Sequence, residues 1–191
     1  MAPSARREQL LACALRTFAA KGLGETRHTD LAQAAGVALP TTFHYYPTRG
    51  ELTEAVLDEV SRFLLDDIVA PHSAAATPAA VAIEQILMTF CDAMETHPDH
   101  VRVWLEWSVA LRDALWQRYQ KFYRGALAAI GRLLARGVDD GSIAADLDRD
   151  AAARVIVGLA HMIVQMRLSG STRAQVDHTV RSLIRGYLQP K

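Results

Sequence analysis

The segment of residues 30–49, DLAQAAGVALPTTFHYYPTR, constrains the fold more than any other part of this 191-residue chain. Its small alanines let one short helix approach a second one closely and at a steep angle. Gly36, which lies between them, can take the left-handed backbone that a sharp turn requires. Pro40 pre-sets the first turn of the second helix, and Pro47 stops it after an aromatic cluster. The pattern therefore predicts two short helices joined by a glycine turn.

Two helices joined in this way form a helix-turn-helix, whose second helix enters the major groove of DNA. In that groove every base pair presents a distinct pattern of hydrogen-bond donors and acceptors. We therefore expect the second helix, which begins near Leu39, to read base edges.

These residues also carry a family resemblance. The segment from about Leu11 to Leu57 resembles the N-terminal domain of TetR-family transcription regulators, which have an LA-x-x-AG-V turn and then a T-x-[FY]-x-Y-[FY] run. The matches fall in one ungapped run: Phe18, Leu31, Ala32, Ala35, Gly36, Val37, Thr41, Phe43, Tyr45, Tyr46 and Arg49.

Two runs, residues 101–116 (VRVWLEWSVALRDALW) and residues 42–52 (TFHYYPTRGEL), are similar to the LuxR/HapR/SmcR subgroup of quorum-sensing master regulators. His28 and Asp30 also fit the start of the second helix in that subgroup. The chain departs from the subgroup before the first helix, where only Arg6 and Arg7 stand in place of a longer arginine-rich arm. This departure puts minor-groove contacts of the arm in doubt.

Apolar residues recur at spacings of three and four, which predicts an all-α chain of about nine helices. Residues 1–50, here called the head, are expected to bind DNA. Residues 51–191, called the body, are expected to bind a ligand and to dimerise, as the resemblance implies. The helices are expected near 4–20, from 29, from 39, 48–70, 78–96, 101–111, 113–136, 148–167 and 172–188. The fourth helix, about 49–70, connects head and body, and residues 71–78 are expected to form a loop.

The formal net charge is zero, but its distribution is uneven. Residues 1–50 hold six basic and three acidic side chains, whereas the other 141 residues hold 15 basic and 18 acidic ones. A positive head suits contact with phosphates, although ordinary surface variation also gives such an excess.

Two cysteines, Cys13 and Cys91, lie in apolar periodic runs, so a disulfide framework is not expected and a reducing cytoplasm fits. The N-terminus has no long apolar core of a secretory signal. The eighteen or so uncharged apolar residues of a membrane span are not found in the sequence. We expect a cytoplasmic protein with no membrane partner.

The resemblance implies which side chains of the head meet DNA. Apolar groups at the start of the second helix suit a thymine methyl, and hydroxyl or imidazole groups suit bases or phosphates. The helix N-termini suit phosphates. The expected contacts are Thr29, Leu39, Pro40, Thr41, His44, Tyr45, Arg49 and His28. For Tyr45 a mainly structural role is the alternative, and for His28 a plain surface position. Phe43 and Tyr46 are expected in the core.

One small head buries too little surface for tight specific binding, so a homodimer on a near-palindromic operator is expected. The last two helices are the expected interface, as in the family, through Val155, Gly158, Leu159, Val180, Leu183, Ile184 and Tyr187. The alternative is that these side chains simply pack against their own body.

Large apolar and aromatic groups are dense in the body, and ligand pockets are mostly of that character. The resemblance implies a pocket for a small hydrophobic or aromatic ligand, lined by Phe90, Met94, Trp104, Trp107, Tyr123, Leu127 and Gln165. An ordinary core is the alternative for each residue. The ligand would act by swinging the fourth helix and so changing the spacing of the two heads.

Enzyme and metal chemistry find no support in the motifs. No G-x-S-x-G, phosphate loop or H-E-x-x-H is present, so no catalytic residue, cofactor or metal is expected. Glu106 is expected to form a structural ion pair, with Arg102 favoured because it lies four residues earlier on the same helix face. Arg112 as the partner and a ligand contact are the alternatives. The function predicted is a ligand-responsive DNA-binding regulator that acts as a repressor or dual regulator. The alternatives are a regulator of the same fold that responds to a protein partner, and an all-helical small-molecule carrier or enzyme.

Overall fold

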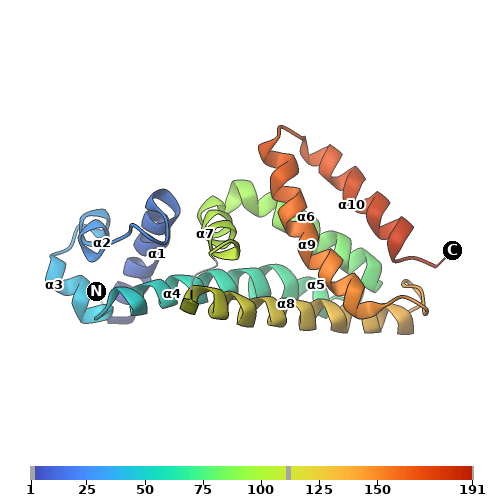
Figure 1. The fold of residues 1–191 in the computed structure, drawn as a ribbon, viewed down its shortest axis with the longest axis horizontal. Helices are drawn as coiled ribbons and strands as arrows, with labels where there is room; N and C mark the ends of the chain where they lie inside the picture. Colours follow the sequence, from blue (N-terminus) through green and yellow to red (C-terminus); the bar gives the residue numbers. More distant parts are fainter. Residues whose placement is uncertain (1–2, 111–112, 191) are drawn as a thin grey trace. The chain divides into compact units, whose positions relative to one another are not determined.

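The computed structural model describes residues 3–110 and 113–190, and every regular element in these ranges is a helix (Figure 1). The all-α prediction is confirmed. The elements are α1 Pro3–Lys21, α2 His28–Ala35, α3 Leu39–Tyr45, α4 Arg49–Arg62, the π-helix η1 Phe63–Val69, α5 Ala70–Ala74, α6 Ala79–Thr96, α7 Pro98–Ser108, α8 Asp113–Asp139, α9 Arg149–Leu168 and α10 Arg173–Tyr187.

Helix starts follow their capping residues. The Thr48 hydroxyl accepts the backbone N–H of Glu51 at 3.1 Å and so caps the start of α4. Asp148 caps α9 through its carboxylate, which accepts two backbone N–H groups. Thr172 and Gln175 form a reciprocal capping box at the start of α10. Side chains that satisfy free N–H groups thus set these boundaries.

The predicted end of the fourth helix, before Pro71, is wrong. Helical structure runs on without a break from α4 through η1 to Ala74, so residues 71–74 are not a loop. Pro71 lies in the first turn of α5, where its missing N–H and fixed backbone angle are tolerated. If α4, η1 and α5 are counted as one helical stretch, the described chain has the nine helices that were expected.

The chain packs as two compact units. The first unit comprises the residues up to Phe63 together with His97–Trp116, so it contains α1 to α4 and α7. The second comprises Leu64–Thr96 and the chain from Gln117, with α6, α9 and α10. Helix α7, which the sequence analysis counted with the body, therefore packs with the DNA-binding elements. The division at residue 50 stays a prediction.

The core of the first unit forms around α1, which packs against α2, α4 and α7. Phe18 of α1, Leu31 of α2 and Leu52 of α4 are fully buried there. Trp107 of α7 is also buried, and its Nε1 donates to the Leu115 carbonyl at 2.9 Å. A buried indole normally has such a partner for its N–H. The helix-turn-helix thus rests on a core that α7 helps to build.

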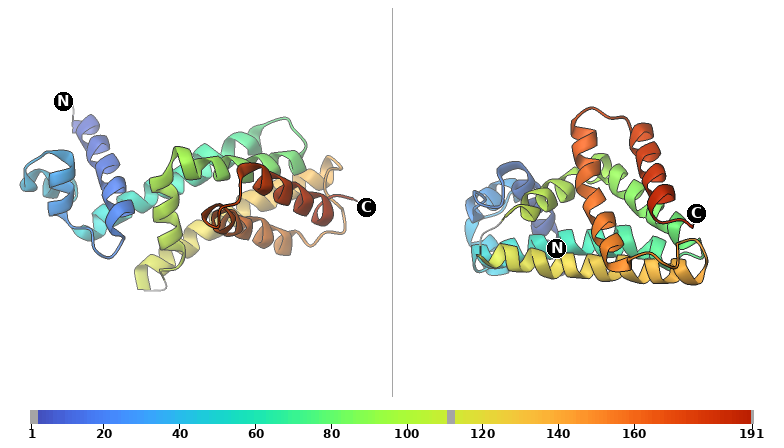
Figure 2. Two further views of the ribbon diagram at one scale, coloured as in Figure 1. Left: turned by 90° about the horizontal axis from the view of Figure 1, so that it is seen from above. Right: turned by 45° about the vertical axis from the view of Figure 1, so that its right-hand side comes forward.

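In the second unit, α6 packs against α9 and α10, and α9 and α10 lie side by side (Figures 1 and 2). Ile83, Ile163 and Val180 fill the space between these helices with no exposed surface. Gly137 of α8 is tightly enclosed, since a β-carbon there would lie 2.4 Å from Cδ1 of Ile143. A larger side chain at that position would force the Ile143 side chain to move.

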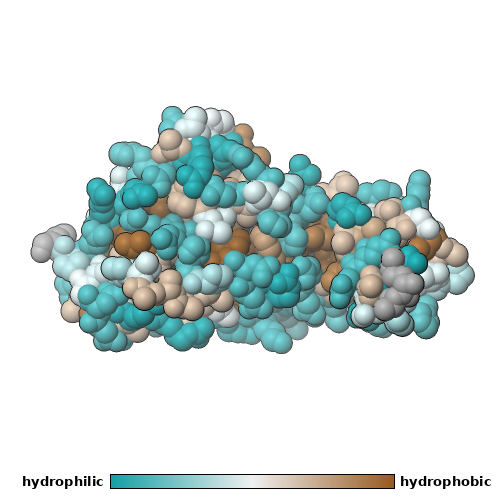
Figure 3. Space-filling view, turned by 180° about the vertical axis from the view of Figure 1, so that it is seen from behind, coloured by the Kyte–Doolittle hydropathy of each residue, from teal (hydrophilic) through white to brown (hydrophobic). Residues whose placement is uncertain are grey.

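Helix α9 is, among the described helices, long and apolar enough to cross a membrane by length and composition alone. This qualifies the expectation that no stretch could span a membrane. Core helices of soluble proteins meet the same criterion, and Arg154 interrupts the apolar run of α9. The face of the molecule in Figure 3 is largely hydrophilic, with apolar residues in small separate patches.

Candidate nucleic-acid interface

The turn between α2 and α3 has the geometry that the sequence predicts. Gly36 lies in the left-handed region, with φ 62° and ψ 38°. The N–H of Gly36 donates to Gln33 at 3.3 Å, and the N–H of Val37 donates to Ala32 at 3.1 Å. These bonds satisfy the last carbonyls of α2 and turn the chain sharply into α3.

Helix α3 presents its expected reading face to solvent. Leu39, Pro40 and His44 are exposed, and Thr41 and Tyr45 are half-buried. Thr42 takes the inward position instead, where its hydroxyl donates to the Leu39 carbonyl at 2.8 Å. The residues predicted to face DNA on α3 are therefore all accessible, and their contacts with bases stay a prediction.

The prediction that Phe43 belongs to the core is wrong. Its side chain is 45 % exposed and stacks on the ring of His28, with centroids 4.2 Å apart and planes at 9°. The inward position on this short helix belongs to Thr42, so the next residue points outward and covers the imidazole. The same prediction is confirmed for Tyr46, which is 1 % exposed.

His28 lies inside the first unit and not on its surface. It is 6 % exposed, and its Nε2 lies 2.7 Å from the Tyr46 carbonyl oxygen. Because a carbonyl only accepts, Nε2 carries the proton. Both sequence-based readings of His28, a phosphate contact or a plain surface position, are corrected. The imidazole ties the start of α2 to the end of α3.

Tyr46 also joins the end of α3 to α1. The Arg7 guanidinium lies over the Tyr46 ring at 5.0 Å from its centroid, and the Tyr46 hydroxyl donates to the Arg7 carbonyl at 3.4 Å. Burial raises the pKa of Tyr46, so it stays a neutral donor. Arg6 donates to Gln9 at 2.8 Å. Both arginines thus lie within α1, and neither is part of an extended arm.

Arg49 anchors the loop between α1 and α2. Its guanidinium donates to the carbonyls of Leu23 at 2.6 Å and Thr26 at 2.9 Å, and also to that of Gly24. The planar fork of donors suits several carbonyls at once. A phosphate at Arg49, as predicted from the sequence, would have to compete with these three carbonyls.

The N-terminal end of α2 is a second exposed part of the interface. Thr29 is exposed there, as is Arg27 directly before the helix. Asp30 accepts from Lys21 at 2.6 Å and from the Arg27 backbone N–H at 2.8 Å, and these bonds lower the pKa of Asp30. The sequence analysis missed Arg27. The sequence could have indicated Arg27, because it is a basic residue immediately before a helix start, where phosphate binding is favoured.

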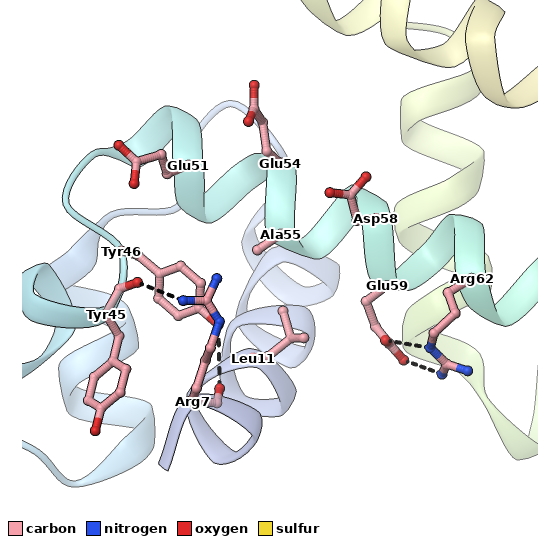
Figure 4. Close-up of a pocket in the computed structure, with 10 residues that line it drawn as sticks. All are labelled: Arg7, Leu11, Tyr45, Tyr46, Glu51, Glu54, Ala55, Asp58, Glu59 and Arg62. Atoms are coloured by element: carbon pink, nitrogen blue, oxygen red, sulfur yellow. Dashed lines mark hydrogen bonds and ion pairs between the residues drawn. The ribbon is translucent and has the colours of Figure 1, made fainter. Parts of the chain in front are cut away.

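A groove of about 520 Å³ lies beside the end of α3, between α1 and α4 (Figure 4). Tyr45, Tyr46 and Leu11 form part of its wall. Four carboxylates of α4 also line it, those of Glu51, Glu54, Asp58 and Glu59. Clustered negative charge repels DNA phosphates. Arg7 and Arg62 line the groove as well, so its charge is mixed, and the prediction that DNA meets α3 and the start of α2 is unchanged.

Helix α7 reaches the same loop that Arg49 holds. The carboxylate of Glu106 accepts the backbone N–H of Leu23 at 2.8 Å. The expected partner of Glu106 was Arg102, one turn earlier on the same helix. The sequence pattern could not identify the contact with Leu23, because the two residues are 83 positions apart.

The side chains predicted to line a ligand pocket fall in both units. Trp104 and Trp107 are buried in the first unit. In the second unit, Phe90 is buried, Gln165 is exposed, and the remaining predicted residues are half-buried, namely Met94, Tyr123 and Leu127. The ligand site stays a prediction.

An aromatic cluster on α8 adds to the second unit. The rings of Tyr119 and Tyr123 lie nearly parallel, with centroids 6.1 Å apart. Burial raises the pKa of Tyr119 to about 12, with a smaller contribution from Tyr123. Tyr119 therefore stays neutral at physiological pH, and the two rings give the region an apolar character with polar hydroxyl ends.

The residues predicted to form a dimer interface divide into two groups. Val155 and Leu183 are 44 % and 39 % exposed, Tyr187 is 41 % exposed, and Gly158 is exposed as well. The others, Leu159, Val180 and Ile184, are buried within the unit. These three are corrected from interface to core residues, because α6 and the α9–α10 contact already cover that side of the helices.

In the described part of the chain, histidines, cysteines and carboxylates do not gather in threes that could hold a metal ion. His97 and His100, which the sequence places beside Pro98, flank the Phe63 ring at 4.7 and 4.3 Å. The Nε2 of His100 lies 3.5 Å from Glu59, and burial lowers the pKa of His100.

Two family models match the chain. Residues 10–56 match the bacterial regulatory proteins of the tetR family, and residues 79–189 match the C-terminal domain of BetI-type transcriptional repressors. The chain belongs to the TetR family of DNA-binding transcriptional regulators, with a C-terminal domain of the BetI type. The matching families and curated relatives are transcriptional regulators and repressors.

Similar proteins agree with this assignment. The chain is 27 % identical to the HTH-type transcriptional regulator LuxR of Vibrio harveyi, over 98 % of this chain and 89 % of LuxR. Its fold is similar to FadR of Bacillus subtilis in complex with stearoyl-CoA, with a TM-score of 0.79, 18 % identity and coverage of 93 % and 96 %. It is also similar to a regulator from Saccharomonospora viridis in complex with choline, with a TM-score of 0.80, 19 % identity and coverage of 98 % and 100 %.

Proposed function

We propose that this protein is a cytoplasmic homodimer that binds a near-palindromic operator, as a repressor or dual regulator, and responds to a small hydrophobic or aromatic ligand. The observation that carries the proposal is the exposed face of α3 beside the exposed N-terminal end of α2. A fixed, accessible helix of this kind is what major-groove reading requires.

In this proposal the accessible side chains of α3 contact the bases. Leu39 and Pro40 offer apolar contact to a thymine methyl, and the hydroxyl and imidazole groups of Thr41, His44 and Tyr45 offer hydrogen bonds. The His44 ring meets the edge of Tyr45, with centroids 5.0 Å apart, which limits the rotamers of both. Phosphate contact falls to Thr29 and Arg27 at the start of α2.

A dimer is supported by apolar side chains exposed on α9 and α10. Val155, Leu183 and Tyr187 are exposed there, and so is Leu168, which is 72 % exposed. A two-fold dimer through this face would present two copies of α3 to half-sites about one DNA turn apart. That arrangement supplies the contact area that one head lacks.

The ligand chemistry is inferred from the side chains of the second unit. FadR holds stearoyl-CoA and the Saccharomonospora regulator holds choline, so the fold accepts ligands of very different chemistry. Here Phe90, Tyr119 and Tyr123 make the candidate lining aromatic, and Leu127 adds an aliphatic group. A lining of this composition favours a hydrophobic or aromatic molecule.

Selection of duplexes from a random pool tests the proposal, with the His44→Ala/Tyr45→Ala double variant as the control. We expect the wild-type protein to enrich a near-palindrome and the double variant to enrich no motif. Enrichment of the same motif by both proteins would refute reading by α3. Wild-type protein that enriches no motif even at low salt would refute binding of DNA by the unliganded protein.

A further inference from the structure

The loop between α1 and α2 is fastened by polar groups from two other helices. From α4, Arg49 donates to the carbonyls of Leu23 and Thr26. From α7, Glu106 accepts the N–H of Leu23 at 2.8 Å. Leu23 and Thr26 are 4 % and 0 % exposed, so the loop is an ordered part of the first unit. The residues after it, Arg27 and Thr29, open α2.

The approach of Glu106 to this loop depends on a glycine. Gly22 has φ +94°, and a β-carbon there would lie 3.2 Å from Oε1 of Glu106. The Gly22 carbonyl also accepts the Thr26 hydroxyl at 3.0 Å. Glycine suits this position because it adopts the left-handed backbone without strain and leaves room for the Glu106 carboxylate.

The C-terminal end of α1 carries partial negative charge and disfavours a carboxylate beside it, and the bond from the Leu23 N–H offsets part of that cost. Glu106 is also exposed, and water competes for its oxygens. The packing of α7 against α1 therefore holds the carboxylate in place. A link of this kind breaks when α7 shifts.

Helix α7 follows α6 and precedes α8 in the chain, and both of these belong mainly to the second unit. A rearrangement of α6 or α8 that displaced α7 would therefore act on the loop before α2 through Glu106.

We propose that Glu106 is a positioning residue, which fixes the α1–α2 loop and with it Arg27 and Thr29 for contact with DNA phosphates. The inference rests on the proposed DNA-binding function and names the residue through which α7 controls it. Loss of the Glu106–Leu23 bond would loosen one end of α2 while the fold of the unit persists.

The test measures amide hydrogen exchange at Leu23 in the full-length protein. Glu106→Ala removes the acceptor, Glu106→Gln keeps a side-chain oxygen, and Arg102→Ala is the matched control on the same helix. We expect exchange at Leu23 to rise about tenfold or more in Glu106→Ala, to rise less in Glu106→Gln, and to stay at the wild-type rate in Arg102→Ala. Unchanged exchange in Glu106→Ala would overturn the proposal.

The second readout is the affinity for the duplex that the wild-type protein enriches. We expect Glu106→Ala to raise the dissociation constant about five- to fiftyfold at an unchanged melting temperature, with most of the affinity restored in Glu106→Gln. Faster exchange with unchanged affinity, or an equal loss in Arg102→Ala, would overturn the positioning role. A wild-type protein that binds no duplex would overturn the DNA-binding function itself, and the exchange data would still establish whether the contact exists.

Discussion

The sequence-based interpretation and the structure assign different roles to Arg49. As a phosphate contact, it would act through its charge. In the structure its guanidinium instead bonds three carbonyls of the α1–α2 loop. Hydrogen bonds to charged groups contribute about 1.5–3 kcal/mol each when buried. Because Arg49 is exposed and one side chain makes all three bonds, we expect Arg49→Ala to cost about 1–2 kcal/mol in total.

Arg49→Lys discriminates the two roles, because lysine keeps the charge but has no fork of donors for three carbonyls. A loop anchor predicts that both variants lower the melting temperature by about 2–8 °C at one protein concentration, as expected for a chain of this size. It also predicts that the salt dependence of DNA binding keeps its slope. The reasoning would be refuted if both variants kept the wild-type melting temperature. The salt-dependence slope of DNA binding would then fall by about 0.9 per phosphate contact in Arg49→Ala and stay unchanged in Arg49→Lys.

Three further predictions concern the rest of the chain. In denaturant unfolding, Gly137→Ala should destabilise the protein by about 1–2 kcal/mol, because the added β-carbon overlaps with Ile143. Gly131→Ala in the same helix is the control: its β-carbon has no atom within 4 Å, so this change should stabilise the protein by up to about 1 kcal/mol. Leu183→Glu should give a monomer in light scattering at micromolar concentration, and Val81→Glu, at a similarly exposed apolar position, should remain dimeric. The pKa of Asp30 is lowered in the folded protein, so its stabilising effect is present above the ordinary carboxyl pKa and is lost as pH falls through the folded value. Asp30→Asn should therefore flatten the acid limb of the unfolding curve, and an unchanged acid limb would contradict the assignment.

Local signals in the sequence predicted most of the fold. The caps at Thr48, Asp148 and Thr172 and the turn at Gly36 each act within five residues, so a single sequence displays them completely. Pro71 led to a wrong helix end because a proline normally breaks an α-helix interior, and the sequence alone did not show that the π-helix η1 lies directly before it and changes the hydrogen-bond register.

The candidate site was predicted less completely, for a physical reason. On a helix as short as α3, periodicity alone does not say which of two adjacent residues points inward, so Phe43 was assigned to the core although Thr42 takes the inward position. His28 was misplaced because its partner, the Tyr46 carbonyl, comes from another helix. The Glu106–Leu23 contact likewise depends on how distant segments pack.

The central claim is that α3 reads DNA sequence through His44 and Tyr45. The most direct measurement is the ratio of dissociation constants for a scrambled duplex and for the enriched duplex, in the wild-type protein and in the His44→Ala/Tyr45→Ala variant. We expect a wild-type ratio of about 10³ or more at physiological salt and a loss of at least about tenfold in the variant, confined to the enriched duplex. An equal loss of affinity for both duplexes, or a wild-type ratio near one, would contradict the claim.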